Sequence, residues 1–119
     1  MNPADARIVR APIARHDLEE LASARFGDMV KAVVDVVRGV MAISGELHSD
    51  EEAMLLEDGS RQADLWGINL YPAETGPDWI EFDSMINVRP SQNNRSRTVE
   101  DAATREAIHR VVQSLVRDA

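Results

Sequence analysis

The residues from 101 to 119 carry the feature that most constrains the fold, an apolar stripe with the period of an α-helix. Apolar side chains recur at i, i+3, i+4, i+7 and i+8, namely Ile108, Val111, Val112, Leu115 and Val116. Asp101 is suited to cap this helix, and Glu106 and Arg110 are spaced as a favourable ion pair. A helix with one apolar face must bury it, so the rest of the chain has to supply a broad apolar surface.

Four stretches with the character of β-strands supply that surface. The valine-rich run 30–37 and the run 40–44 flank Arg38-Gly39, which predicts a hairpin. Residues 64–71 and 79–90 are each followed or closed by proline and predict two more strands. Alternation is clearest in the last run. One side receives Ile80, Phe82, Ile86 and Val88, and the other receives Glu81, Asp83, Asn87 and Arg89.

Capping-box spacings predict two further helices, at about 17–26 and 50–57. Residues 1–14 are expected to form an extended N-terminal arm, with a short strand at 7–10. Short turns between neighbouring strands favour antiparallel pairing. We therefore predict one domain over residues 1–119 of class α+β. It is a two-layer sandwich, an antiparallel four-stranded sheet with two or three helices on one face.

Composition narrows the classes of function. The chain has no cysteine, which excludes disulfides, a thiolate nucleophile and cysteine-based metal sites, and which fits a reducing compartment. Its net charge of −8 argues against a generic nucleic-acid binder, because a phosphate backbone would be repelled. The apolar stretch 29–43 is interrupted by charged residues and is too short to span a membrane. The N-terminal residues lack the apolar core of a signal peptide, so we expect a cytoplasmic protein.

If helices cover one face of the sheet, its other face is polar. The three strand regions would place there Lys31, Asp35, Leu65, Gly67, Asn69, Tyr71, Glu81, Asp83, Asn87 and Arg89. A solvated face with cross-strand charge pairs is the commonest arrangement of this kind. The alternatives are a shallow pocket, in which Gly67 leaves room for a ligand or another backbone, and a face covered by a second subunit.

The segment GELHSDEE, residues 45–52, offers candidate chemistry. Glu46 and His48, together with Glu81, Asp83 and Asn87, are the candidate catalytic residues of a small hydrolase or metal-assisted enzyme. No recognised metal-binding spacing is present, so no metal site is predicted, and no particular cofactor is indicated. Acids at the start of a helix are also expected from the helix dipole alone, and this explanation is the stronger one.

The segment RPSQNNRSR, residues 89–97, gathers three arginines in an acidic chain. Residues 46–58 carry six acids and no base, which favours pairing between the two segments, within one chain or across a homodimer. Capture of a small anion or a nucleotide is the alternative. The candidate ligand-binding residues are Asn69, Asn87, Arg89, Asn94, Arg95 and Arg97.

Whole segments of the chain resemble a family of small, uncharacterised bacterial and archaeal proteins that is classed only as a domain of unknown function. The resemblance covers roughly residues 30–116. Its matching features are Lys31 to Asp35, Glu46-Leu47-His48, Gly59-Ser60, Leu65-Trp66-Gly67, Asn69, Pro72, Trp79 to Ser84, and Asn94 to Arg97. The resemblance implies a prokaryotic origin and no particular activity.

Three functions follow from these observations. The favoured one is a non-enzymatic binding or interaction module that forms a homodimer, because charge blocks are complementary and no catalytic signature is present. The second is the hydrolase or metal-assisted enzyme. The third is binding of an anion or nucleotide by residues 89–97.

Overall fold

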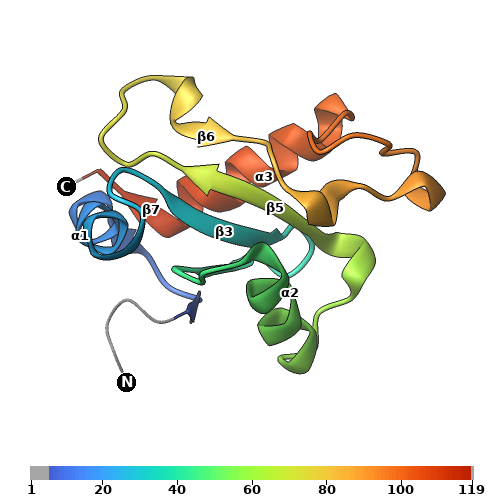
Figure 1. Cartoon of the computed structure of the whole chain (residues 1–119), viewed down its shortest axis with the longest axis horizontal. Coiled ribbons are helices and arrows are strands. Elements are labelled where there is room, and N and C mark those ends of the chain that lie inside the picture. Colours follow the sequence, from blue (N-terminus) through green and yellow to red (C-terminus); the bar gives the residue numbers. More distant parts are fainter. Residues whose placement is uncertain (1–5, 119) are drawn as a thin grey trace.

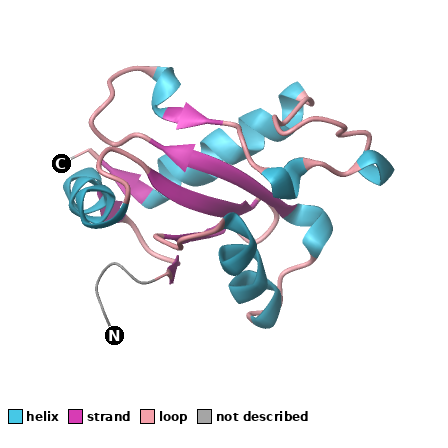
Figure 2. Cartoon of the chain, in the orientation of Figure 1, coloured by secondary structure: helices cyan, strands magenta, loops and turns pink. Residues whose placement is uncertain are grey.

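The computed structural model describes residues 6–118, and its mixture of helices and strands confirms the α+β class (Figures 1 and 2). An antiparallel sheet of five strands has the order β1-β4-β3-β5-β6. These strands are β1 (Arg7–Val9), β3 (Val30–Asp35), β4 (Val40–Ile43), β5 (Leu65–Leu70) and β6 (Ile80–Glu81). A separate parallel pair joins β2 (Ile13–Ala14) to β7 (Val116–Arg117). The helices are α1 (Arg15–Arg25), α2 (His48–Glu57) and α3 (Ala102–Leu115).

The apolar stripe of α3 is buried as its period predicts, against the same side of the sheet as α1. Ile108, Val111, Val112 and Leu115 belong to one core cluster with residues of α1, β3, β4 and β5. Trp66, Ile68 and Leu70 supply the β5 part of this core, as expected. The predicted cap also forms, because Asp101 accepts a hydrogen bond from the N–H of Thr104 at 3.0 Å.

Helix α2 lies on the opposite face of the sheet from α3, which corrects the two-layer arrangement (Figure 1). Two helices cover one face, and the third covers part of the face that was expected to be open. The reason is that the strands carry apolar side chains on both faces. Val33, Ala42 and Leu65 point away from α3 and form a second core cluster with Leu55 of α2.

The predicted long strand 79–90 is wrong beyond its first residues. β6 ends at Glu81, and the chain continues through the 3-10 turns η3 (Met85–Asn87) and η4 (Pro90–Gln92). Hydrogen bonds from short polar side chains compete with strand pairing here. The hydroxyl of Ser84, for example, accepts from the N–H of Ile86 at 3.3 Å. The sheet has five strands and not the four that were predicted, because β1 pairs with the free edge of β4.

The helix starts also differ from the prediction. Helices α1 and α2 begin two residues earlier than expected, and neither has a side-chain cap, so the two predicted capping boxes do not form. Within the N-terminal arm, residues 7–9 and 13–14 form strands, while residues 1–5 lie outside the described part of the chain. No helix within residues 6–118 is long and apolar enough to cross a membrane.

Candidate functional site

Three polar side chains form a row across β3, β5 and β6. Lys31 is directly opposite Asn69 in the sheet register, and Asn69 is directly opposite Glu81. Residues opposite each other in antiparallel strands present their side chains on the same face. This is the face away from α3, because the neighbouring residues Val30 and Leu70 belong to the α3 core. The predicted polar face therefore exists at the end of the sheet nearest the start of α2.

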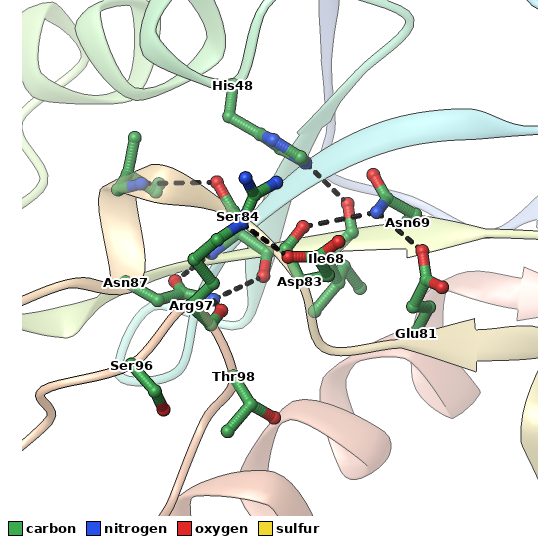
Figure 3. Close-up of polar contacts among 12 residues, drawn as sticks. His48, Ile68, Asn69, Glu81, Asp83, Ser84, Asn87, Ser96, Arg97 and Thr98 are labelled. Atoms are coloured by element: carbon green, nitrogen blue, oxygen red, sulfur yellow. Dashed lines mark hydrogen bonds and ion pairs between the residues drawn. The ribbon is translucent and has the colours of Figure 1, made fainter.

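A hydrogen-bond network joins the amide and the acid of this row to the backbone of Asp83 (Figure 3). The side-chain nitrogen of Asn69 donates to Glu81 Oε1 at 2.9 Å and to the carbonyl of Asp83 at 3.1 Å. The hydroxyl of Tyr71 donates to the same Glu81 oxygen at 3.1 Å. Partial burial, and then the negative charge of Glu81, raise the pKa of Tyr71. Asn69 is 6% exposed, and its side-chain oxygen has no hydrogen-bond partner.

His48 is the first residue of α2 and reaches toward the sheet (Figure 3). Its Nε2 donates to the carbonyl of Ile68 at 2.8 Å, because a carbonyl oxygen can only accept. Burial lowers the pKa of His48, and the nearby positive charges of Lys31 and Arg97 lower it further. The hydrogen bond to Ile68 and the charge of Asp83 act in the opposite direction. The ring is therefore neutral at pH 7, with Nδ1 as an acceptor.

A cavity of about 190 Å³ opens beside His48, and we call it the α2 pocket. Its lining consists of Lys31, Leu47, His48, Ser49, Ser84, Met85, Ile86 and Arg97. Arg97 donates through Nε to Asp83 at 2.7 Å, which leaves its two terminal nitrogens for other acceptors. The ammonium of Lys31 lies 5.3 Å from the ring centre of Phe26 and, among the described residues, forms no ion pair. Two cations thus line the pocket, and no acid does within the described chain.

Asn87, a predicted catalytic and ligand-binding residue, ends the η3 turn and is 0% exposed. Its side chain accepts from the N–H of Gly67 at 2.8 Å and donates to the carbonyl of Gly67 at 2.9 Å. A third bond goes to the carbonyl of Arg97 at 3.0 Å. The space expected beside Gly67 is occupied by Ser84, since a Cβ at Gly67 would stand 2.6 Å from the Ser84 side chain.

Arg89 and Asn94, two more predicted ligand residues, hold the backbone of their own region. The Arg89 guanidinium lies 4.1 Å from the ring centre of Trp66 and donates to the carbonyls of Gln62, at 2.6 Å, and Leu65. The Asn94 side chain is buried and donates to the carbonyls of Asn87 and Thr98, both at 2.7 Å. These contacts occupy the polar groups that a ligand would need.

The remaining predicted site residues fall into two groups, one at the α2 pocket and one away from it. Arg97 lines the α2 pocket, and His48, Asn69, Glu81 and Asp83 lie in or beside it. Glu46 and the side chain of Arg95 are exposed and, within the described chain, form no side-chain hydrogen bond or ion pair. Burial lowers the pKa of Arg89, and the negative charge of Glu52 opposes this shift, but no ion pair within residues 6–118 joins the arginine segment to the acidic segment. Asp58 binds Arg10 at 2.5 Å and Arg38 at 2.6 Å instead, and these guanidinium groups lower the pKa of Asp58 to about 2.

A larger cavity of about 670 Å³ lies on the α3 side of the sheet, between Trp66, the turn at 92–94 and the start of α3. It contains one predicted ligand residue, Asn94, whose side chain already bonds the backbone. The carboxylate of Glu100 at its rim accepts from the N–H groups of Arg95 and Ser96, at 2.8 Å and 2.9 Å. The larger cavity is therefore not where the predicted residues converge.

Lys31 was expected on the polar face of the sheet, but it was not among the predicted site residues. One signal was available, since Lys31 is the only lysine of the chain and stands in an otherwise valine-rich strand. Ser84 was missed as well. It enters the pocket wall only because Asn87 holds the 84–87 turn against Gly67.

The fold and its contacts define a small α+β domain with a cationic pocket between a helix start and the polar part of a sheet face. The chain belongs to the family described as protein of unknown function (DUF5674), whose model matches residues 7–115. This membership confirms the resemblance found from the sequence. No curated protein and no solved structure matches the chain.

Proposed function

We propose that this protein is a binding module for a small anion, which it holds in the α2 pocket. One observation carries the proposal. Lys31 and Arg97 both line the same small cavity, and none of its described lining residues is an acid. Cations are usually matched by carboxylates in a chain of net charge −8, so an unmatched Lys31 stands out. The two free terminal nitrogens of Arg97 suit the two oxygens of a carboxylate or phosphate group.

Other groups around the pocket support the same proposal. His48 stays neutral beside the two cations, so the imidazole can accept a proton when an anion arrives. The hydroxyl of Ser49 adds a further donor to the lining. The absence of cysteine from the sequence supports the cytoplasm as the place of action.

The enzymatic alternative has less support from the contacts. Within residues 6–118, the hydrogen bond of the His48 ring goes to the backbone carbonyl of Ile68, and no hydroxyl nucleophile is hydrogen-bonded to the ring. Asp83 and Glu81 are engaged by Arg97, Asn69 and Tyr71. No three histidine or acidic side chains among the described residues are grouped to hold a metal ion. Both catalysis and the homodimer stay predictions from the sequence.

The pKa of His48 gives a direct test, because an anion bound between Lys31 and Arg97 stabilises the imidazolium form. We expect inorganic phosphate and acetate to raise this pKa above its value in chloride of equal ionic strength, measured by NMR titration of the ring protons. Lys31→Met and Arg97→Gln should each remove the increase. Arg110→Gln, on the exposed side of α3, serves as the charge-matched control and should retain it. An equal pKa in all three salts, or an increase that survives both pocket variants, contradicts the proposal.

A further inference from the structure

Two of the large apolar side chains that are exposed on this protein stand at the α2 pocket. Met85 is 65% exposed and Leu47 is 52% exposed, and both line the cavity together with Lys31 and Arg97. Apolar side chains of this size gain about 1.5–3 kcal/mol when they are fully buried. Their position beside a cationic cavity therefore points to an apolar group that covers them.

Hydrogen bonds hold the backbone at both residues in place. Leu47 immediately precedes α2, and the carbonyl of Leu47 accepts from the N–H of Asp50 at 3.1 Å in the first turn of that helix. Met85 begins η3, a turn held at its two ends by the side chains of Ser84 and Asn87. Its neighbour Ile86 packs against the second core cluster, which turns Met85 outward. The backbone of the rim is therefore already ordered before a ligand covers it.

The other lining residues narrow the chemistry further. Ile86 adds a partly buried apolar wall, and the neutral ring of His48 adds surface without charge. The described lining contains no tryptophan, tyrosine or phenylalanine, so a nucleobase would find only the small ring of His48 to stack on there. The volume of about 190 Å³ suits a single anionic group, and the rest of the ligand would lie over the rim.

We propose that the ligand of the α2 pocket is an organic carboxylate with an apolar body. Its carboxylate lies between Lys31 and Arg97, where a guanidinium can bind both oxygens, and its hydrocarbon part covers Leu47 and Met85. This inference rests on the proposed anion site and adds the class of molecule that the site selects. Charge complementarity supports an acid over a neutral apolar compound, since both cations border the same cavity as the rim.

The test compares sodium hexanoate with sodium acetate and with 1-hexanol, using NMR shifts of the Ser49 and Met85 amides and of the His48 ring. We expect hexanoate to bind at least about tenfold more tightly than acetate, because two or more buried methylene groups supply that difference. Hexanol, which has the body without the charge, should bind more weakly than hexanoate. Equal affinity for hexanoate and hexanol would contradict a carboxylate head.

Two sets of variants separate this inference from the proposed function. Leu47→Ser combined with Met85→Ser should abolish the preference for hexanoate over acetate and leave acetate binding unchanged, while Lys31→Met should weaken both acids. Val37→Ser is the matched control, because Val37 is 71% exposed in the β3–β4 turn, outside the pocket lining. If acetate and hexanoate bind equally, the apolar ligand is contradicted and the anion site is supported. If neither acid binds, both the apolar ligand and the anion site are contradicted.

The same exposed rim could instead be covered by a second copy of this chain. Light scattering after size-exclusion chromatography distinguishes this case at the concentrations of the NMR titration. We expect the unliganded parent and the unliganded rim double variant to have the same molar mass. A dimer that dissociates on Leu47→Ser with Met85→Ser would assign the rim to self-association and overturn the carboxylate.

Discussion

The side-chain amide of Asn87 hydrogen-bonds both backbone groups of Gly67, at 2.8 Å and 2.9 Å, as a residue of a neighbouring strand would. β6 pairs with the Asn69–Leu70 end of β5 and not with Gly67. Beyond the end of β6, the amide of Asn87 therefore replaces the missing strand, and it supplies hydrogen-bond partners for the backbone at the edge of β5. This contact also sets the position of Ser84 and Met85 at the α2 pocket.

Asn87→Ala should lower the free energy of unfolding by about 2–5 kcal/mol. It leaves the buried N–H and carbonyl of Gly67 without partners, and each unsatisfied group costs about 1–3 kcal/mol. Urea denaturation followed by circular dichroism measures the effect. Ser91→Ala, in the exposed η4 turn, is the control and should change stability by less than about 0.5 kcal/mol. A loss at Asn87 as small as that control would mean that water replaces the amide.

Gly67→Ala should destabilise the protein through a clash with Ser84. The new Cβ would lie 2.6 Å from both the Cβ and the Oγ of Ser84, and overpacking of this kind costs about 1–3 kcal/mol. Adding Ser84→Gly removes both atoms, so the double variant should be more stable than the sum of the single changes predicts. A double-mutant cycle in urea measures this coupling. Additive losses would show that the nearby Ile86 side chain, 3.1 Å from the new Cβ, is the real obstacle.

The sequence predicted those parts of the fold in which one periodic pattern decides the structure. The α3 stripe and its Asp101 cap, the β3–β4 hairpin and strand β5 all lie close to their expected places. Residues 79–90 alternate just as clearly, yet they leave the strand after Glu81. Local side-chain bonds from Ser84 and Asn87 overrule the alternation there, and nothing in the spacing of apolar residues reports such bonds.

The candidate site was predictable only in part. The register of period two placed Lys31, Asn69 and Glu81 on one face, and the structure brings them into one row. The side of the sheet chosen by α2 was not predictable, because the strands around Val33 are apolar on both faces. Because α2 lies on this side of the sheet, His48 stands beside the row of polar side chains, and the α2 pocket forms between them. The roles of Arg89 and Asn94 depend on turns between distant segments, which composition does not reveal.

Arg89→Lys separates a structural role from the predicted ligand role. Lysine keeps the charge but cannot stack on Trp66 or donate to the carbonyls of Gln62 and Leu65 in the same fork. We expect a loss of about 1–3 kcal/mol in unfolding free energy and no change in acetate affinity. The control is Arg95→Lys, because the exposed Arg95 side chain forms no hydrogen bond or ion pair within the described chain, and the stability of this variant should stay within about 0.5 kcal/mol of the parent. Unchanged stability with weaker acetate binding would restore Arg89 as a ligand residue.

Glu51 in α2 makes the folding stability fall as the pH rises, which is the opposite of the usual effect of an acid. Its side chain is 0% exposed, and one oxygen accepts from the N–H of Gly45 at 2.8 Å, while the other has no partner. Burial raises the pKa of Glu51 well above its ordinary 4.5, and the Gly45 hydrogen bond offsets this only in part. Between the unfolded and the folded pKa, the folded state keeps a proton that the unfolded state has released. Stability from this group therefore falls as the pH rises above 4.5 toward the folded pKa.

Glu51→Gln should remove that slope, because glutamine is uncharged at every pH and can still accept from the N–H of Gly45. The stability of the variant relative to the parent should rise with pH, by at most about 1.4 kcal/mol per pH unit for one proton. Urea denaturation of both proteins between about pH 5 and pH 8 measures the difference. Glu57→Gln removes an exposed charge from the same helix and should leave the curve parallel to the parent. Parallel curves for Glu51→Gln as well would mean that the buried carboxyl is ionised throughout this range, held by Lys31 and Arg25.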